Sequence, residues 1–496
     1  MLFNSYEFLL AFLPVCLVGF FLLGGAGWTR AASLWLSFMS LGFYAWWNPD
    51  PSHPWNPKYL GLIVGSIVFN YLLGVRISAA IGHDARSSAK AALTFGVTVN
   101  LVVLAYYKYA NFLVDNLNAL TGTHFAHAHI ALPLAISFFT FTQIAYLVDS
   151  FHGVTKEYNF RWYLLFVSFF PHLIAGPIVL YRSLMPQFAK KETWRFNADN
   201  FAAGLSLFAF GLFKKAVIAD SISPIANRAF GLVEGGTALG MAAAWFGVFA
   251  YALQLYFDFS GYSDMAVGIG KMFNVAFPLN FNSPYKARDI IDFWRRWHIT
   301  LSQFLRDHLY IPIGGNRLGG ARRYFNLFLT MLLGGLWHGA GWTFIIWGAL
   351  HGTYLVVNHA WLNFCKDRAW ANSPAARLAG WAATFVAVLV GWVFFRAKTL
   401  PDALTLLAGM AGGHGLGGVF PAKTLDCLIV LAAAVLAFFA PNTQEIFRLA
   451  QFGKSAEDPE RRLWQPSRVW AVASAVVLVT GFLQLSGVTE FLYFQF

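Results

Sequence analysis

Charged residues are scarce in this chain. Asp, Glu, Lys and Arg make up 12% of its 496 residues, whereas soluble globular domains carry about 25%. Hydrophobic residues account for 58% of the chain and the mean hydropathy is +0.55. This is more apolar side chain than a soluble protein can bury in its core. The composition therefore excludes a soluble protein and predicts an all-α, polytopic integral membrane protein.

Cysteine is scarce as well. Cys16, Cys365 and Cys427 lie in or beside apolar segments, without the spacing of a metal motif. They argue against a disulfide framework and against a zinc site. The sequence also lacks an internal repeat, and this argues against a transporter built from duplicated halves.

Apolar segments of membrane-spanning length recur along the chain. A transmembrane helix needs about 20 predominantly apolar residues. The candidate segments are 8–24, 31–48, 59–77, 91–107, 130–150, 200–219, 237–257, 378–396, 425–440 and 469–486. The first lacks a basic flank and a small-residue cleavage site, so we expect a retained span rather than a signal peptide. We predict a single domain over 1–496, with roughly 10–12 transmembrane helices.

Two further apolar segments do not fit a simple crossing. Segment 163–181 is broken by Pro171 and Pro177 and contains His172. Segment 324–357 is too short for two crossings of about 20 residues each. Both are predicted to be re-entrant or kinked segments that approach a polar cavity, where irregular backbone is tolerated at membrane depth.

The net charge is +12, with 35 Lys and Arg against 23 Asp and Glu. If the chain starts outside and crosses at each span, most of the Lys and Arg fall in the inside loops. This asymmetry follows the positive-inside rule and predicts that both termini are periplasmic. The net positive charge of the chain therefore requires no nucleic-acid partner.

Segment 271–342 holds the most distinctive residues and is predicted to be the catalytic core. Its basic and aromatic part contains His298, and apolar side chains from Ile290 onward fall on one arc at 100° per residue. We predict one amphipathic helix of about six turns, broad enough to lie in a membrane interface, that ends at Pro312. The arginines of this segment would bind either coenzyme A phosphates or lipid headgroups.

His338 follows an apolar run and is surrounded by glycines. A histidine in such a run must be solvated by something, so we expect it to face a cavity. Asp258 lies at membrane depth too, and a buried carboxylate requires a partner. These polar residues have a second interpretation, as hydrogen bonds that pack helices together. From the residues alone, the chain is a polytopic protein with a polar intramembrane cavity.

Several motifs resemble the membrane-bound O-acyltransferases, most closely the bacterial branch that contains alginate O-acetylase. The two longest are FNSPYKARDIIDFWRRWHITLSQFLRDHLYIPIGGNR (281–317) and GGLWHGAGWTFIIWGALHG (334–352). The others are LPLAISFFTFTQIAYLVD (132–149), FFPHLIAGPIVLY (169–181), GLFKKAVIAD (211–220), LQLYFDFSGYSDMAVGIG (253–270), GWVFFRA (391–397), FFAPNTQEIF (438–447) and FLYFQF (491–496).

This resemblance implies a helical bundle around a funnel and a set of site residues. His338, in the WHG motif, matches the family's catalytic base, and His298, in the WRRWH motif, matches its second histidine position. His298, Asn282 or a nearby serine would orient the thioester or stabilise charge. The candidate substrate-binding residues are Asn282, Trp294, Arg295, Ser302, Asp258, Ser260 and Trp337.

The implied reaction is acetyl transfer across the bacterial inner membrane, from cytosolic acetyl-CoA to an exported polysaccharide such as alginate. No bound cofactor and no metal are expected, and the expected partners are membrane lipids and a periplasmic acetyltransferase. Acetylation of peptidoglycan or cellulose, and D-alanyl transfer to teichoic acid, are alternatives on the same fold. A transporter or flippase is the alternative from another class, and it would show no thioester chemistry.

Overall fold

The computed structural model describes most of the chain. The described residues are 1–46, 58–156, 158–174, 176–417, 422–447, 463–485 and 492. The ends of the predicted spans 31–48 and 469–486 lie outside them, as does the C-terminal motif 491–496 apart from Leu492. All regular secondary structure in the described part is helical, as the composition predicts.

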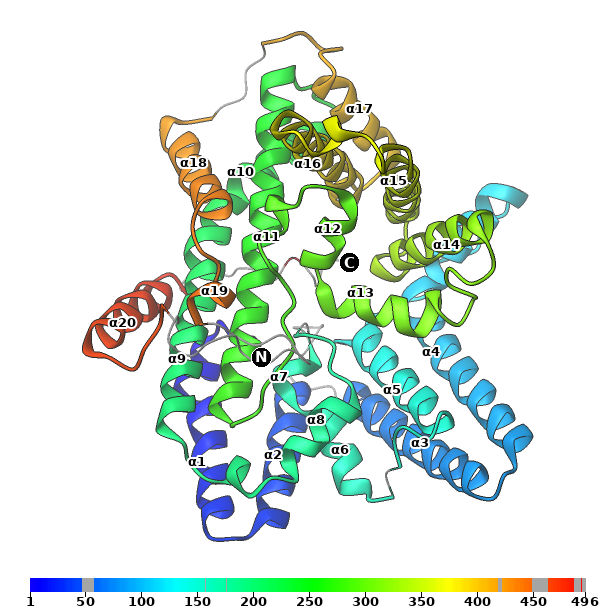
Figure 1. The fold of residues 1–496 in the computed structure, drawn as a ribbon, viewed down its shortest axis with the longest axis vertical. Coiled ribbons are helices and arrows are strands. Elements are labelled where there is room, and N and C mark those ends of the chain that lie inside the picture. Colours follow the sequence, from blue (N-terminus) through cyan, green and yellow to red (C-terminus); the bar gives the residue numbers. More distant parts are fainter. Residues whose placement is uncertain are drawn as a thin grey trace. The chain divides into compact units, whose positions relative to one another are not determined.

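The α-helices follow one another along the chain as Figure 1 shows. They are α1 (Leu13–Gly25), α2 (Thr29–Ala45), α3 (Lys58–Gly82), α4 (Arg86–Thr121), α5 (Ile136–Phe151), α6 (Phe160–Ser168), α7 (Phe170–Leu173), α8 (Tyr181–Phe188), α9 (Ala198–Phe213), α10 (Asp220–Glu234), α11 (Met241–Met272), α12 (Ile290–Arg296), α13 (Ile299–Leu305), α14 (Gly320–His338), α15 (Trp342–Cys365), α16 (Pro374–Arg396), α17 (Leu400–Met410), α18 (Thr424–Phe438), α19 (Thr443–Phe447) and α20 (Arg468–Leu483). Short 3₁₀ segments are η2 (Lys191–Trp194), η4 (Pro284–Lys286) and η6 (Ala369–Asn372), and π-helical segments are η1 (Phe8–Phe12), η3 (Lys214–Ala219) and η5 (Arg306–Tyr310).

Long apolar helices confirm the membrane character. Among the described residues, five helical stretches are long and apolar enough to cross a membrane: Phe8–Gly25, Tyr59–Gly82, Arg86–Thr121, Ala198–Glu234 and Pro374–Arg396. Each overlaps one of the predicted spans. Shorter apolar helices cover Leu400–Met410, Thr424–Phe438 and Arg468–Leu483. The total number of crossings, and the orientation of the termini, stay predictions.

The helices form two compact groups. The first comprises Met1–Ala209, Asp264–Pro278 and Pro466–Val472, and the second comprises Phe210–Ser263, Leu279–Gln465 and Ala473–Phe496, as far as these are described. Helices α9, α11 and α20 each contribute residues to both groups.

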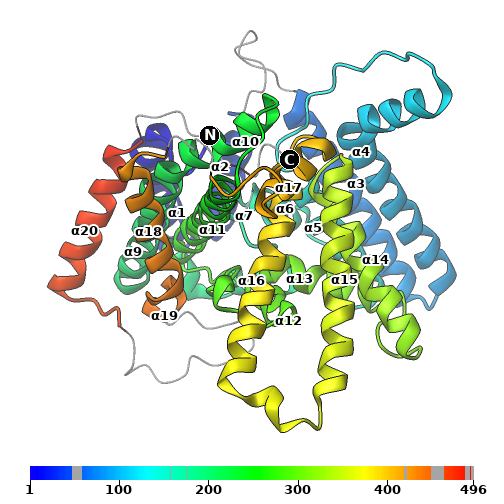
Figure 2. The same ribbon diagram turned by 90° about the horizontal axis from the view of Figure 1, so that it is seen from above.

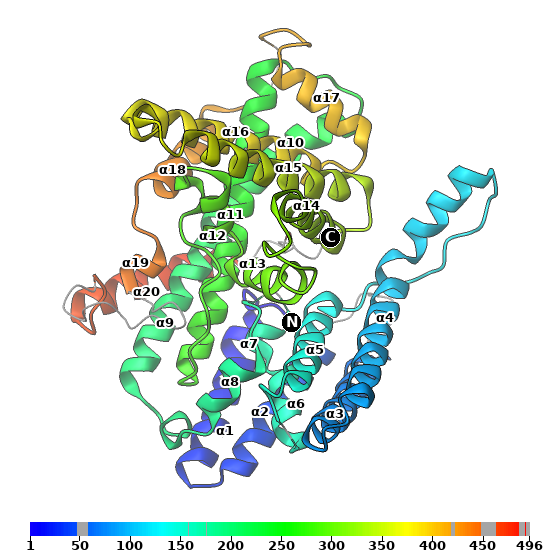
Figure 3. The same cartoon turned by 45° about the vertical axis from the view of Figure 1, so that its right-hand side comes forward.

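In the first group, α3, α4 and α5 pack together (Figure 3). Asn70 on α3 and Asn100 on α4 donate to each other's side-chain oxygens at 3.1 and 2.7 Å. Gln143 on α5 donates to Ser66 Oγ at 2.9 Å. Here the packing interpretation of polar residues at membrane depth fits the contacts, because the hydrogen bonds join neighbouring helices.

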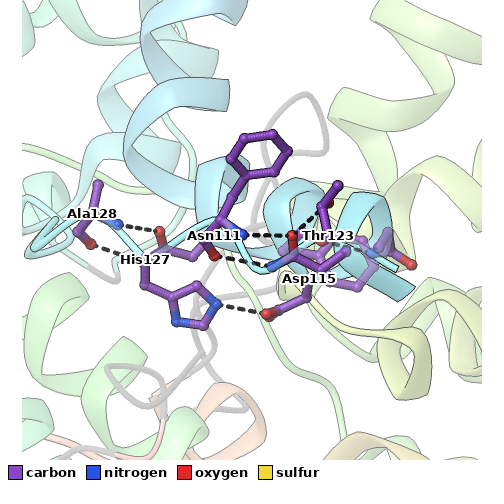
Figure 4. Close-up of polar contacts among 9 residues, drawn as sticks. Asn111, Asp115, Thr123, His127 and Ala128 are labelled. Carbon is purple, nitrogen blue, oxygen red and sulfur yellow. Dashed lines mark hydrogen bonds and ion pairs between the residues drawn. The ribbon is translucent and has the colours of Figure 1, made fainter. Parts of the chain in front are cut away.

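The C-terminal end of α4 is covered by the loop that follows it (Figure 4). Asn111 Nδ2 donates to the Ala128 carbonyl and Asn111 Oδ1 accepts from the Ala128 N–H, both at 3.1 Å. His127 contacts the Asp115 carboxylate, and both side chains are more than half exposed. The Asn111 side chain therefore bonds both backbone groups of Ala128. The exposed ion pair between His127 and Asp115 contributes little stability.

The segment 163–181 is broken, as its prolines predict. Helix α6 ends at Ser168 and the short α7 begins two residues later, with Pro171 in its first turn. His172 is buried and its Nε2–H donates to the Phe166 carbonyl at 2.9 Å. This histidine therefore belongs to the packing of the first group. Whether the segment re-enters the membrane stays a prediction.

In the second group, α14 and α15 form a helical hairpin whose turn is residues 339–341. A Cβ added to Gly348 would lie 2.5 Å from the Met331 carbonyl oxygen, so the two backbones approach too closely for any side chain there. Gly335 faces Gly348 in the same contact. Helix α16 packs beside α15 (Figure 2). Segment 324–357 therefore folds back on itself, and whether it re-enters the membrane without crossing it stays a prediction.

The predicted six-turn amphipathic helix from Ile290 is wrong. Helix α12 ends at Arg296 and α13 begins at Ile299, because His298 has left-handed backbone angles, φ +42° and ψ +56°. The segment before α12 stabilises the break: Asn282 N–H donates to the Arg296 carbonyl and Ile299 N–H donates to the Asn280 carbonyl, both at 2.9 Å. A left-handed non-glycine residue costs roughly 1–2 kcal/mol, so these contacts hold His298 in a strained position.

Candidate active site

His298 lies at the break between α12 and α13 and is fully buried. Its Nδ1 lies 2.9 Å from Asn280 Oδ1, and its ring meets the edge of Phe259 with centroids 4.8 Å apart. Burial lowers the pKa of His298 to about 3, because an apolar environment disfavours the imidazolium. The imidazole is therefore neutral near pH 7.

His338 is the last residue of α14, at the turn of the α14–α15 hairpin, and 7% of it is exposed. Its ring packs against Trp347 at 5.0 Å and Phe395 at 5.2 Å, measured between ring centroids. The next residue, Gly339, lies so close to the Phe344 ring that a Cβ there would overlap it. Helices α14, α15 and α16 thus hold the imidazole between aromatic rings.

Aromatic rings connect the surroundings of the two histidines. In order, the chain of ring contacts runs through His338, Trp347, Trp392, Trp297, Phe281 and His298, with centroid distances of 5.0, 6.1, 4.8, 5.1 and 6.5 Å. Both family histidines therefore belong to one packed aromatic region of the second group.

A third histidine lies in the same region. His351 on α15 is fully buried, and its Nδ1 accepts a hydrogen bond from Trp294 Nε1–H at 3.3 Å. A Cβ on Gly391 of α16 would lie 2.8 Å from His351 Nε2. The predicted site residue Trp294 is thus hydrogen-bonded to a buried imidazole.

A cavity of about 820 Å³ opens beside this region, between α12, α13, α14 and α15. This volume is within the range of small-molecule sites, about 300–1,000 Å³. The predicted residues Trp294, Arg295 and Ser302 line it, together with Arg306, Arg323 and His359.

The basic wall of the cavity is preorganised. Arg323 Nη2 donates to His359 Nδ1 at 2.8 Å. The pKa of His359 is lowered by its burial and by the neighbouring Arg323 charge, so His359 accepts as a neutral ring and Arg323 carries the charge. Arg306 makes a bidentate contact with Asp307, at 2.7 and 3.1 Å. A wall with Arg295 and Arg323 favours an anionic ligand.

Asp258 has the partner that its burial requires. Lys215 Nζ lies 2.7 Å from Asp258 Oδ1 and 2.7 Å from Asp220 Oδ1, and the Leu492 N–H donates to Asp258 Oδ2 at 3.2 Å. Ser260, two residues further along α11, is buried as well. Asp258 thus belongs to a buried ion-pair network, and its role in substrate binding stays a prediction.

The remaining predicted residues line other parts of the second group. Asn282 Oδ1 accepts from Asn442 Nδ2 at 2.9 Å, and Trp337 packs on the neighbouring His338 at 4.9 Å. Neither is part of the cavity wall, nor are His298 and His338. The structure therefore separates the predicted set into the cavity wall, the adjoining aromatic region and the ion-pair network of Asp258.

The sequence interpretation missed Asn280 and His359 and did not single out Arg323. Arg323 and His359 are 36 residues apart and meet because the α14–α15 hairpin folds back on itself. Asn280 is 18 residues from His298. The basic composition of segment 271–323 was the one available signal for Arg323.

Comparison with known proteins identifies the family. The model of the membrane-bound O-acyltransferase family matches residues 89–398. The chain belongs to the membrane-bound O-acyltransferase family. The match includes both family histidines and the whole cavity wall. This membrane-bound O-acyltransferase is therefore an enzyme that transfers acyl groups to hydroxyl oxygens.

Relatives of this acyltransferase carry related names. The chain is 45% identical over 444 residues to the peptidoglycan O-acetyltransferase of Helicobacter pylori, covering 84% of this chain and 81% of that protein. It is 47% identical over 415 residues to the probable alginate O-acetylase of Azotobacter vinelandii, covering 83% and 78%. The teichoic acid D-alanyltransferase of Bacillus subtilis is 29% identical over 277 residues, covering 53% and 69%.

Proposed function

We propose that this acyltransferase moves acetyl groups from acetyl-CoA to hydroxyl groups of an exported polysaccharide. The observation that carries the proposal is the basic cavity beside the two family histidines, in a chain whose similar relatives are named O-acetylases or O-acetyltransferases. Acetyl-CoA is a substrate in this reaction, and the protein needs no bound cofactor for it.

His338 would act as the general base. A sugar hydroxyl is a poor nucleophile until its proton is removed, and a neutral imidazole is a suitable base near neutral pH. As His338 takes the proton, the hydroxyl oxygen forms a bond to the thioester carbonyl carbon. The carbon–sulfur bond then breaks, and the thiolate of coenzyme A leaves and takes up the proton.

The cavity would hold the charged part of the donor. Arg295 and Arg323 carry charges that suit the phosphates of coenzyme A, and guanidinium groups bind phosphates through paired hydrogen bonds. The alternative occupant is a phospholipid headgroup, which presents the same phosphate chemistry. The KM for acetyl-CoA is expected to depend on these arginines only if the cavity binds coenzyme A.

The acceptor would be a polymer outside the bacterial inner membrane, reached with the help of a periplasmic acetyltransferase. Alginate is one candidate. Peptidoglycan is the second, because a relative with that activity in its name is 45% identical to this chain. Both termini would lie on the periplasmic side, with the basic loops in the cytosol.

The experiment that tests the proposal is acetyl transfer in membranes that contain the protein. Acetyl-CoA labelled in the acetyl group is added from the cytosolic side of inverted vesicles. Label is expected in extruded polysaccharide, or in a supplied soluble acceptor sugar. A protein that transports a sugar or lipid without thioester chemistry would leave the label in acetyl-CoA, and this result would overturn the proposal.

Replacing Arg323 with glutamine is expected to raise the KM for acetyl-CoA about tenfold with little change in kcat, since a charge-assisted hydrogen bond contributes about 1.5–3 kcal/mol. The matched control is Arg322→Gln. Arg322 is exposed and lies over the Phe325 ring, outside the cavity wall. An unchanged KM in the Arg323 variant would mean that the cavity binds a lipid headgroup rather than the donor.

A further inference from the structure

Asn280 is the centre of a buried group of hydrogen bonds at the break between α12 and α13. It is 1% exposed. Its Oδ1 lies 2.9 Å from His298 Nδ1, 2.9 Å from Thr300 Oγ1 and 3.3 Å from the Thr300 backbone nitrogen. Its Nδ2 donates to Ser263 Oγ at 3.3 Å.

The Thr300 backbone N–H determines the orientation of the Asn280 side-chain amide. A backbone N–H can only donate, so the atom that faces it must be the carbonyl oxygen of the side chain. In the reverse orientation the Asn280 NH₂ group would face the Thr300 N–H, which is also a donor. Ser263 Oγ would then no longer accept a hydrogen bond from Asn280. The orientation of Asn280 therefore follows from its partners rather than from a choice between similar atoms.

This orientation determines the tautomer of His298. The Asn280 oxygen can only accept, so His298 Nδ1 must carry the hydrogen. In a neutral imidazole the other nitrogen, Nε2, then carries the lone pair. Nε2 is buried and has no hydrogen-bond partner among the described residues. Such an atom is costly to leave unsatisfied in a folded protein.

We propose that Asn280 is a positioning residue that holds His298 with its Nε2 lone pair available, so that His298 accepts a hydrogen bond from an N–H or O–H group of a substrate. The inference rests on the proposed acyl transfer and assigns His298 a specific part in it. With Nδ1–H committed to Asn280 and Nε2 lacking a hydrogen, His298 cannot donate to the oxyanion of the tetrahedral intermediate. The oxyanion donor must be another group.

The tautomer can be measured without any activity. The full-length protein is labelled with ¹⁵N-histidine and its spectrum is compared with that of His298→Gln, which removes one of 13 histidine signals. The signal that disappears is expected to show a protonated Nδ1 and an unprotonated Nε2 through the neutral pH range. A protonated Nε2 in the wild-type protein would overturn the inference, whether or not the enzyme transfers acetyl groups.

Kinetics then test whether Asn280 acts through His298. Asn280→Ala is expected to lower kcat about 10- to 100-fold, as for other residues that orient a functional histidine. The double variant Asn280→Ala/His298→Ala is expected to be no worse than His298→Ala alone, because both remove the same interaction. Additive losses would mean that Asn280 has a separate, structural role.

Ser263→Ala is the matched control. It removes the partner of Asn280 Nδ2 in the same buried group, but leaves the contacts of Oδ1 with His298 and Thr300 in place. The control is expected to keep kcat within a few-fold of wild type. A loss in Ser263→Ala as large as that in Asn280→Ala would assign both residues to packing, and would overturn the positioning role.

Asn280→Asp adds a readout that packing alone would not change. The carboxylate still accepts from His298 and Thr300, but its charge stabilises the imidazolium. In the wild type, burial alone shifts the pKa of His298, and its described contacts with Asn280, Phe259 and Phe281 carry no charge. In the variant His298 is protonated below its raised pKa, so activity is lost as pH falls and returns as pH rises. An acid limb of kcat that does not move to higher pH would contradict the inference.

Discussion

Replacing His338 with alanine is expected to abolish acetylation of the polysaccharide while the protein stays in the membrane at its normal level. A general base contributes about 10²- to 10⁴-fold to the rate, and a loss of this size removes detectable acetylation in cells. The measurement is the acetyl content of the polysaccharide, normalised to the amount of acyltransferase in the membrane fraction.

His172→Ala is the matched control for this prediction. His172 is buried like His338, but its Nε2–H is bonded to the Phe166 carbonyl in the first helical group. Its replacement is expected to lower the amount or stability of the protein, with the activity per molecule retained. If His338→Ala retained acetylation per molecule, His338 would be a packed residue as well, and the catalytic assignment would fail.

The sequence predicted those features of the fold that depend on local composition. Long apolar segments predicted the five described helical stretches that are long and apolar enough to cross a membrane, and Pro171 predicted the interruption between α6 and α7. The burial of Asp258 predicted a charged or polar partner, and Lys215 supplies it. In each case the cause lies in the residues of the segment itself or in a general cost of burial.

The break at His298 was not predictable in this way. Periodicity from Ile290 describes a continuous helix, and histidine has no general preference for left-handed backbone angles comparable to that of glycine. The break is stabilised by backbone hydrogen bonds to Asn280 and Asn282, which precede α12 in the sequence. The position of the second family histidine therefore depends on a contact between segments, which a pattern within one segment does not contain.

The composition of the cavity wall has the same origin. Arg323 is at the start of α14 and His359 is near the end of α15, so they meet only when the hairpin forms. The hairpin in turn depends on close backbone contact at Gly335 and Gly348. Gly335 is one of the glycines around His338 that the sequence shows, but the sequence does not show which residues the hairpin brings together.

Replacing Lys215 with methionine is expected to cost the protein about 3–5 kcal/mol of stability, because it leaves a buried carboxylate without its counter-charge. Lys215 is 1% exposed and bridges Asp258, which is 2% exposed, and Asp220, which is 13% exposed. Asp258 is expected to account for most of this loss of stability, because it is the less exposed of the two carboxylates. The measurement is the midpoint of thermal unfolding in detergent, together with the fraction of monodisperse protein recovered.

Two further variants separate charge from packing in this network. Lys215→Met/Asp258→Asn removes the stranded charge while the amide oxygen still accepts the Leu492 N–H, so it is expected to recover most of the lost stability. Lys214→Met is the control on the neighbouring residue, which is only half-buried and whose Nζ donates to the Thr443 hydroxyl at 3.1 Å, and a smaller shift is expected. If the double variant were no more stable than Lys215→Met, the loss would come from the packing of the lysine stem, and the ion pair would not be what holds η3 (Lys214–Ala219) against α11.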